Sequence, residues 1–558
     1  MYKNKIIVNK ILEMIDTLIE ASKYLCRFVN DSNYVEFQNV SLEMNNMLKS
    51  IYKTLCKIKK EEDIVNVDLI CESVMFSLNR IRILSKSRSE KTLSKLEFEL
   101  VPLLQEMYSQ FYFWSYIYGD KDRVNEYYRN EMLNLCSNKY IDLSEKKGKY
   151  KYDLSIVVIG YNKLEYTKQC IENLLNYVQC NIKYELILVN HGSEDGTKEY
   201  FEFISPTKQL DIFRNGGGIA AVSRIIEGKY TLSISNDVII TKNCIENMIR
   251  CIKSDENIAW VVPSTPNVSN FQTIEGKYSN IEEMHNFAEK NNISNIYRWE
   301  QRSKLCNPID LAKSSAFYSS KGINFWGHVC GKNQFSFPDD KISYLLRRNG
   351  YKMVLAKDAY CYHFGSVTLK EEIVSCKDEK TNKNIFYEQG RAEFKEAFGI
   401  DPWGTGFCWD PQLFAYLPCN DTDHVDILGV NCGIGSNPLK IRESIKENVH
   451  NLDAVIYNVT DEQCYVEDLK GVSDIAQYVE SIENLPEALD NTDFKYIVLE
   501  SNLEKYEEPT TIVEKLKQRL KKEGILAVKC SEKYLKAKVV AKYPNSIEAG
   551  QWIILKNL

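Results

Sequence analysis

The sequence predicts a multidomain α/β protein, with an N-terminal bundle of helices, a central domain built on a parallel sheet, and a second α/β domain at the C-terminus. Apolar residues recur at helical spacing through residues 1–145, and short β-branched runs alternate with helical segments from residue 153 onward. A stretch rich in proline, glycine and aromatic residues, 401–422, then separates two such alternating regions. We therefore expect a helical domain at 1–145, α/β domains at 153–400 and 423–558, and a boundary at 401–422.

Composition and charge exclude several classes of protein. The chain has 558 residues, of which 44% are hydrophobic and 27% charged, so that each domain can build a packed core. Its formal net charge of −6 argues against a protein that binds nucleic acid. The 17 cysteines lie without CxxC spacing, which indicates reduced thiols in a cytoplasmic protein. The N-terminus lacks the pattern of a signal peptide. The sequence has no uncharged apolar run of about 18 residues, so we expect no transmembrane helix.

The first 145 residues have the pattern of a helical bundle. Apolar side chains share one helical face at Ile7, Ile11 and Leu18. Proline is absent before Pro102, and glycine is absent before Gly119. We expect four or five helices that form a structural or docking module without chemistry of its own.

The central region has the pattern of βαβ units. Buried strands are predicted at 154–160, 184–190 and 230–235, with a helix at 166–177 between the first two. Ligands of such sheets bind beyond the carboxyl ends of the strands. The candidate functional residues are therefore those that close or follow each strand, namely Tyr161, Asn162, Asn190, His191, Asn236 and Asp237.

The acidic residues and one histidine of this region allow two kinds of chemistry. Asp237 ends a strand, where a carboxylate can hold a divalent cation or simply open a turn. Asp339 and Asp340 precede an amphipathic helix, where they can cap its N-terminus or accept a proton from a substrate hydroxyl. His363 ends a further strand-like run, and an imidazole there suits a structural contact or a transition metal such as Mn²⁺.

Taken in order, these motifs closely resemble family-2 glycosyltransferases of the GT-A fold. The resemblance rests on SIVVIGYNKLEYTKQCIENLL, ELILVNHGSEDGT and RNGGGIAAVSRIIEGKYTLSISNDVIIT, followed by FSFPDDKISYLLRRNGYKMVLAKDAYCYHFG. It spans residues 153–366 and is closest to the bacterial subset whose metal motif is Asn-Asn-Asp. It implies an inverting enzyme that transfers a hexose or N-acetylhexosamine from a nucleotide sugar, with UDP as the expected nucleotide and Mn²⁺ or Mg²⁺ as the metal.

Carried over by position, the resemblance implies a role for each candidate. Asp237 and His363 are the expected metal ligands. Asp339 is the expected base, with Asp340 the alternative because the glutamate of the base motif is replaced here. Whichever of these two acids is not the base is expected to cap the helix or to contact an arginine later in it. The residues expected to contact the nucleotide sugar are Tyr161, Asn162, Asn190, His191, Arg224, Asn236 and Trp326.

The C-terminal region resembles S-adenosylmethionine-dependent methyltransferases, which have a Rossmann-like fold. LGVNCGIGSNPLKI matches their first motif, and FKYIVLESNLEKYEEPTTIVEKLKQRLKKEGILAV matches a later strand, helix and turn. The acids that such enzymes use are replaced by Gly429 in the first motif and by Asn458 at the ribose position, and Asn431 replaces a glycine. We therefore expect a methyltransferase-like domain that does not bind S-adenosylmethionine, and whose removal after Thr422 leaves donor hydrolysis in place.

Three functions remain open on the sequence alone. The first is a glycosyltransferase whose acceptor is a hydroxyl of a protein such as flagellin or of a surface glycan, since chains that join these two domain types resemble those of bacterial flagellin and polysaccharide glycosylation. The second is a bifunctional enzyme that also methylates the sugar, which binding of S-adenosylmethionine would distinguish. The third is a non-catalytic scaffold, which hydrolysis of a nucleotide-sugar donor would exclude.

Overall fold

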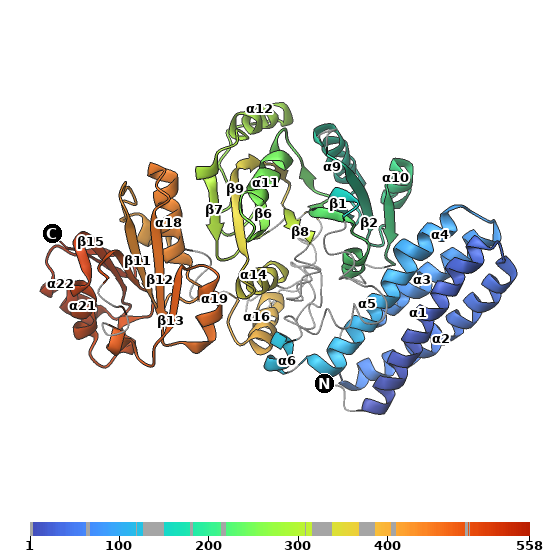
Figure 1. The fold of residues 1–558 in the computed structure, drawn as a ribbon, viewed down its shortest axis with the longest axis horizontal. Coiled ribbons are helices and arrows are strands. Elements are labelled where there is room, and N and C mark those ends of the chain that lie inside the picture. The colour runs from blue at the N-terminus through green and yellow to red at the C-terminus, as the bar shows by residue number, and fades with distance from the viewer. Residues whose placement is uncertain are drawn as a thin grey trace.

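The computed structural model shows three parts that follow one another along an elongated molecule (Figure 1). The N-terminal helices lie at one end, the central sheet in the middle, and the C-terminal sheet at the other end. The described residues are 4–62, 67–118, 120–126, 150–178, 182–213, 219–306, 308–314, 337–365, 367, 385–402, 409–485, 489 and 492–557. Trp326, a residue expected to contact the sugar, lies outside these described residues.

The N-terminal part consists of long helices. They are α1 (Lys5–Asn30), α2 (Tyr34–Glu62), α3 (Val67–Lys86), α4 (Lys91–Lys95), η1 (Leu96–Leu100), α5 (Val101–Tyr112), η2 (Phe113–Ile117) and α6 (Lys121–Glu126). The helical spacing noted in the sequence becomes a buried core that includes Ile11, Leu18 and Leu48. α4 to η2 form one continuous helix, in which η1 and η2 are π-helical turns. η1 comes just before Pro102, which lacks the amide hydrogen that a regular helix would use there.

The described residues of the central part form an eight-stranded mixed sheet in the order β3-β2-β1-β4-β8-β6-β9-β7. Its strands are β1 (Tyr152–Gly160), β2 (Tyr184–Asn190), β3 (Lys208–Asp211), β4 (Gly228–Ser235), β6 (Ile258–Ser264), β7 (Trp299–Arg302), β8 (Ile309–Lys313) and β9 (Lys352–Tyr360). β1 to β4 are parallel, and β8 runs antiparallel to β4 and β6. The three expected strands are present as β1, β2 and β4. β3 is not among the expected strands, because its short run Lys-Gln-Leu-Asp contains a single apolar residue.

Helices and a second, smaller sheet complete the central part. The helices are α9 (Leu164–Tyr177), α10 (Thr197–Ile204), η4 (Ile219–Arg224), α11 (Cys244–Lys253), α12 (Ile281–Asn291), η5 (Ile296–Arg298), α14 (Pro338–Arg348) and α16 (Ile385–Phe398). The small sheet pairs β5 (Val238–Ile239) with β10 (Tyr362–His363) in antiparallel register. This pairing brings the end of β10 to the segment that follows β4, where the sequence places a candidate metal ligand.

The described residues of the C-terminal part form a seven-stranded sheet in the order β13-β12-β11-β14-β15-β17-β16. Its strands are β11 (Val425–Val430), β12 (Ala454–Thr460), β13 (Ile475–Tyr478), β14 (Phe494–Leu499), β15 (Leu520–Lys529), β16 (Ile547–Ala549) and β17 (Trp552–Lys556). Its helices are α17 (Pro411–Phe414), α18 (Ser436–Val449), η6 (Gln463–Tyr465), α19 (Val466–Lys470), η7 (Ile482–Asn484), η8 (Leu503–Lys505), α21 (Pro509–Gln518) and α22 (Lys533–Lys542). β11 lies in the middle of the sheet, so the loop after it opens where the strand order reverses.

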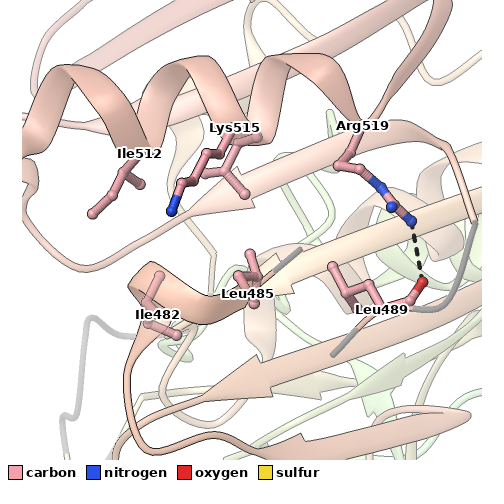
Figure 2. Close-up of a pocket in the computed structure, with 7 residues that line it drawn as sticks. Ile482, Leu485, Leu489, Ile512, Lys515 and Arg519 are labelled. Atoms are coloured by element: carbon pink, nitrogen blue, oxygen red, sulfur yellow. Dashed lines mark hydrogen bonds between the residues drawn. The ribbon is translucent and has the colours of Figure 1, made fainter. Parts of the chain in front are cut away.

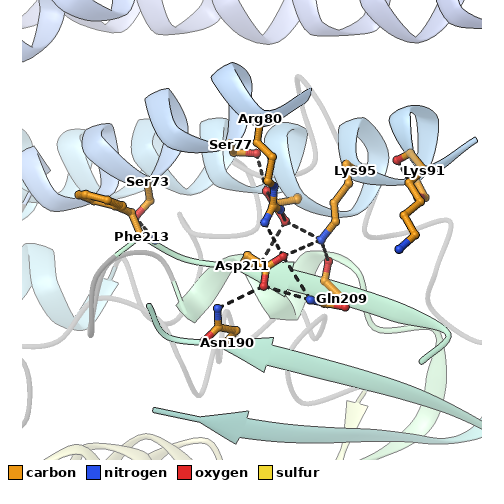
Figure 3. Close-up of polar contacts among 11 residues, drawn as sticks. Ser73, Ser77, Arg80, Lys91, Lys95, Asn190, Gln209, Asp211 and Phe213 are labelled. Atoms are coloured by element: carbon orange, nitrogen blue, oxygen red, sulfur yellow. Dashed lines mark hydrogen bonds and ion pairs between the residues drawn. The ribbon is translucent and has the colours of Figure 1, made fainter. Parts of the chain in front are cut away.

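A buried network of charges attaches the N-terminal helices to the edge strand β3 (Figure 3). Asp211, the last residue of β3, is 1% exposed and pairs with Arg80 at 2.6 Å and with Lys95 at 2.9 Å. Glu99, in the π-helical turn η1, pairs with the same two cations, and its Oε2 accepts a hydrogen bond from the Asp211 amide at 3.0 Å. Burial tends to raise the pKa of Asp211, but the charges of Lys95 and Arg80 outweigh it and hold that pKa well below its ordinary value.

Removing the charge of Asp211 should loosen the N-terminal helices. Asp211→Asn leaves Arg80 and Lys95 without one of their two carboxylates, and breaking a buried ion pair in this way costs about 3–5 kcal/mol. Scanning calorimetry should then show a lower melting temperature for the transition that includes the helices. Lys91→Ala, which removes an exposed pair with Glu202, should cost less than about 1 kcal/mol and serves as the control.

The network also predicts how this attachment responds to acid. The pKa of Asp211 is lowered by folding, so its ionised form stabilises the folded chain at pH values above the ordinary carboxyl pKa of about 3.9. This contribution is lost progressively as the pH falls below that value. The melting temperature of Asp211→Asn should therefore depend less on pH than that of the wild type in this acid range, and equal pH dependence would contradict the assignment.

Candidate functional site

The residues that follow β1 and β4 meet at the carboxyl edge of the central sheet. Asn236 donates from Nδ2 to the Asn162 carbonyl at 3.0 Å and to the Thr167 hydroxyl at 2.9 Å. Asn162 has a left-handed φ of 53°, a conformation that asparagine tolerates, and its side chain accepts from the Glu194 amide at 2.9 Å. These contacts hold the turn after β1 against α9 and the loop after β2. The two asparagines thus shape the edge, and their contact with a nucleotide sugar stays a prediction.

Asn190 and His191, at the end of β2, are both enclosed by protein. Asn190 donates to Asp211 at 3.3 Å and accepts from the Ser193 amide at 3.0 Å, so both ends of its side chain have protein partners. The His191 amide donates to the carbonyl that ends β1 at 2.9 Å. Tyr161 is half-buried beside the same turn. The nucleotide contacts of these residues stay predictions, and the structure adds that Asn190 joins this edge to the charge network of the N-terminal helices (Figure 3).

Arg224 lies in an environment that differs from the one expected for a phosphate contact. Its guanidinium is buried against α5, where Nη2 lies 3.1 Å from Glu106 Oε2 and 2.8 Å from Ser109 Oγ. Burial raises the pKa of Glu106 and outweighs the opposing effect of Arg224. An arginine held in this way joins the N-terminal helices to the central part, so the geometry argues for a structural role of Arg224 in place of the phosphate contact.

Asp237 and His363 lie side by side although they are far apart in the sequence. The small sheet pairs His363 with Val238, and His363 Nε2 comes within 3.3 Å of Asp237 Oδ2. The Val367 amide donates to the same carboxylate oxygen at 3.3 Å, and the Phe364 amide donates to the Asp237 carbonyl at 3.1 Å. Burial tends to raise the pKa of Asp237, but the contacts with His363 and with backbone amides lower it below its ordinary value. The ionised carboxylate is therefore the favoured form.

This pair of side chains has the chemistry of a divalent metal site. A carboxylate oxygen and an imidazole nitrogen are both ligands that Mn²⁺ accepts. Within the part of the chain that the structure describes, no group of three His, Cys, Asp or Glu side chains is placed to hold a metal. Asp237 and His363 are the two described side chains that would hold such a metal, and their role as ligands stays a prediction.

The two acids in the first turn of α14 have different surroundings. Asp340 is half-buried and pairs with Lys304 at 3.0 Å, and burial raises its pKa despite the nearby lysine. Asp339 is half-buried, and its negative charge adds to burial in raising the pKa of the Cys306 thiol. The N-cap position is occupied by Phe337, so neither acid caps the helix with its side chain. The choice of Asp339 over Asp340 as the residue that accepts a proton stays a prediction from the sequence.

A loop with an unusual backbone links the pair Asp237 and His363 to the start of α14. Asn267, Asn270 and Phe271 have left-handed φ angles of 58°, 61° and 51°, a conformation that is uncommon for a bulky residue such as phenylalanine. Asn267 donates to the His363 carbonyl at 3.0 Å, and Asn270 donates to Cys306 Sγ at 2.8 Å. The loop thus connects β10 to the segment beside the start of α14. No motif in the sequence indicates this loop, since the positive φ angles fall on residues that are not glycine.

The C-terminal positions that resemble a methyltransferase motif are enclosed by their own domain. Asn458 is 1% exposed and donates to Ser473 Oγ at 2.7 Å. It lies so close to Gly429 that a Cβ added there would overlap Asn458 Oδ1. Asn431 donates to Asp461 at 2.9 Å. The side chains of Asn458 and Asn431 are therefore both held by neighbouring segments of the same domain.

A small hollow elsewhere in this domain has little room (Figure 2). Apolar residues of η7 and α21 line it together with Lys515 and Arg519, and its volume of about 10 Å³ corresponds to about one water molecule. Arg519 donates to the Leu489 carbonyl at 3.1 Å across one side of it. This hollow is far too small for a nucleoside cofactor.

The enclosed Asn458 leads us to expect that S-adenosylmethionine does not bind. Calorimetric titration should give no heat of binding, and the melting temperature should not rise, because a ligand stabilises only a state that it binds. A nucleoside diphosphate with Mn²⁺, titrated into the same preparation, is the positive control. A dissociation constant in the low micromolar range for S-adenosylmethionine would contradict this reading and favour the bifunctional enzyme.

The fold and these residues define a class of α/β domain that binds its ligand beyond the carboxyl ends of parallel strands, with an acid and a histidine suited to a metal. Residues 155–301 match the family model described as Glycosyl transferase family 2. An uncharacterized glycosyltransferase of Rickettsia bellii is 27% identical over 110 residues, which make up 19% of this chain and 16% of that protein. Glycosyltransferase GlyG of Streptococcus pneumoniae is 28% identical over 110 residues, or 18% of this chain and 36% of that protein. These matches support a glycosyltransferase.

Solved structures of glycosyltransferases are similar to this chain at a low level, as one example shows. The mannosyltransferase PcManGT from Pyrobaculum calidifontis, in complex with GDP-Man and Mn²⁺, is 13% identical, with a TM-score of 0.28 over 40% of this chain and 62% of that one. The chain spans well under half the length of the two curated relatives, as the shares of 16% and 36% show. Throughout the described residues, the helices lack the combination of length and apolar character that a bilayer crossing requires.

Proposed function

We propose that this chain is an inverting, metal-dependent glycosyltransferase. It moves a hexose or N-acetylhexosamine from a nucleotide sugar, with UDP as the first nucleotide to test, to a hydroxyl of a flagellin-like protein or of a surface glycan. The observation that carries the proposal is the 3.3 Å contact between His363 and Asp237, because Asp237 lies within residues 155–301, the range that matches the family model. The order of the sequence motifs supports inversion and the nucleotide-sugar donor.

The proposed reaction is a single displacement at the anomeric carbon. Asp339 accepts the proton of the acceptor hydroxyl, whose oxygen forms the new bond to that carbon. The bond from the carbon to the donor diphosphate breaks at the same time, and its electron pair leaves with the nucleoside diphosphate. Asp237 and His363 would hold a divalent metal, which would supply electrostatic stabilisation of the negative charge on the leaving group. The acceptor attacks opposite the leaving group, so the anomeric configuration inverts.

Calorimetry with UDP and GDP tests this donor site without any need to know the sugar. If UDP or GDP is the leaving group, that nucleotide should bind in the presence of Mn²⁺ and far more weakly in EDTA. The reason is that the proposed metal would contact both the protein, through Asp237 and His363, and the phosphate oxygens. His363→Ala should weaken binding less than Asp237→Ala, since the carboxylate carries the charge. Nucleotide binding that is the same with and without metal would contradict the proposed site.

A further inference from the structure

The C-terminal part binds the helix that carries the proposed base. Asp468, in α19, is fully buried and lies between two arginines at the end of α14. Arg347 donates to Asp468 Oδ1 from Nε at 3.0 Å and from Nη2 at 2.7 Å. Arg348 donates to Asp468 Oδ2 from Nε at 3.0 Å and from Nη2 at 2.8 Å. Each carboxylate oxygen thus receives two charge-assisted hydrogen bonds, which fix the orientation of α14 as well as its position.

Backbone contacts hold the same end of α14. Arg347 also donates from Nη1 to the Ser303 carbonyl at 2.6 Å, and Ser303 Oγ shares a hydrogen bond of 2.6 Å with Ser436 Oγ of the C-terminal part. The turn after α19 packs directly on the backbone of α14, where a Cβ added at Gly471 would lie 2.6 Å from the Arg347 carbonyl oxygen. The end of α14 is therefore enclosed by the C-terminal part from more than one side.

The other end of α14 carries Asp339 and Asp340. The helix has 11 residues and is therefore a rigid rod of about 16 Å. A rotation or shift at the arginine end must move the acids of the first turn. Asp340 is in turn paired with Lys304, the residue next to Ser303, so the same short segment contacts α14 near both of its ends.

We infer that Asp468 is a positioning residue for glycosyl transfer, through which the C-terminal α/β part orients α14 and the base Asp339. This inference rests on the proposed function. It opposes the expectation from the sequence that the chain keeps donor turnover when the residues after Thr422 are removed. Such a truncation would leave Arg347 and Arg348 without their carboxylate.

In this inference the C-terminal part contributes to glycosyl transfer by holding α14 through Asp468. This role needs no cofactor in the C-terminal part. Gly471 allows the turn after α19 to approach α14 closely, since any larger residue would press against the α14 backbone.

Asp468→Asn tests the inference by replacing one acceptor oxygen with a donor that faces an arginine. The kcat of sugar transfer should fall about 10- to 100-fold, as a small misplacement of a catalytic group does, while the KM for the donor changes little. Asp468→Glu should restore part of the loss. Glu443→Gln is the matched control, because Glu443 is 3% exposed and lies in the same interface. It accepts from the Gln301 amide of β7 at 3.0 Å, and it pairs with Lys446 of its own helix.

A purely structural role for Asp468 would give a different result. Asp468→Asn and Glu443→Gln would then lower the melting temperature and leave kcat unchanged, and the inference would be overturned. Gly471→Ala provides a second variant in case Asp468→Asn does not fold, since it presses on the Arg347 carbonyl without changing any charge. It should lower kcat in the same way, and an unchanged kcat in a folded Gly471→Ala protein would also overturn the inference.

Hydrogen exchange separates this inference from the proposed function. In Asp468→Asn, the amides of α14 should exchange faster than in the wild type, including those in the turn of Asp339, while Glu443→Gln should leave them protected. Unchanged protection of α14 in Asp468→Asn would overturn the inference whatever the activity. A wild-type chain that turns over no nucleotide sugar would overturn the proposed function instead, and the inference about transfer with it, while the exchange data would still report whether Asp468 holds α14.

Discussion

Replacing Asp237 by alanine should abolish metal-dependent turnover of the donor while the fold is retained. The carboxylate of Asp237 is the charged member of the pair with His363, and the structure places the two side chains 3.3 Å apart. Without it, the proposed site loses its charged oxygen ligand, the type of ligand that suits Mn²⁺ and Mg²⁺. Release of nucleotide from the donor, measured with saturating Mn²⁺, should drop to the background rate, and His363→Ala should retain part of the activity.

The control for this variant is an acid of the same part that lies away from the site. Asp255 precedes β6, at the amino end of that strand, and pairs with Lys352 at 2.6 Å. Asp255→Ala should leave donor turnover unchanged. Unchanged turnover in Asp237→Ala would remove the metal assignment, whereas equal losses in both variants would indicate a general effect on folding.

Replacing Asp339 by asparagine should slow sugar transfer by about 10²–10⁴, the range for loss of a general base. The substitution keeps the shape of the side chain but removes its basic oxygen, so the affinities for donor and metal should change little. Transfer to an acceptor, followed in single-turnover experiments, separates this step from donor binding.

Asp340→Asn is the matched variant in the same turn. It should cost transfer far less and lower the stability, because Lys304 would be left buried beside a neutral amide. The reverse order of effects would make Asp340 the base, with the motif register off by one residue. If neither variant slows transfer, the base lies elsewhere.

The parts of the fold that follow from local pattern could be predicted from the sequence. The apolar runs of β1, β2 and β4 are long enough to indicate buried strands. Asp237 could be proposed as a metal ligand because it lies two residues after the end of β4. β3 could not be predicted from its composition, because it is short and the partners of its charged ends come from distant segments. Asp211 pairs with Arg80 and Lys95 of the N-terminal helices, and Lys208 pairs with Glu185 and Glu227.

The contacts between distant segments could not be predicted in this way, because no local sequence pattern indicates them. The positive charge of Arg224 suits a phosphate contact, and only the structure shows that its guanidinium pairs with Glu106. Asp468 does not lie in a recognisable motif. The arginines of α14 were expected to contact an acid of their own helix, and in the structure they contact Asp468. In each case the partner is set by how two parts of the chain pack, which a local pattern of residues does not record.

Released nucleotide from a panel of nucleotide sugars tests the central claim most directly. The wild-type chain should hydrolyse at least one donor slowly in the presence of Mn²⁺, with a UDP sugar as the first to examine, and EDTA or Asp237→Ala should stop the reaction. A folded protein that releases nucleotide from no donor with Mn²⁺ or Mg²⁺, or one whose activity persists in EDTA and in Asp237→Ala, would contradict the claim that this chain is a metal-dependent glycosyltransferase.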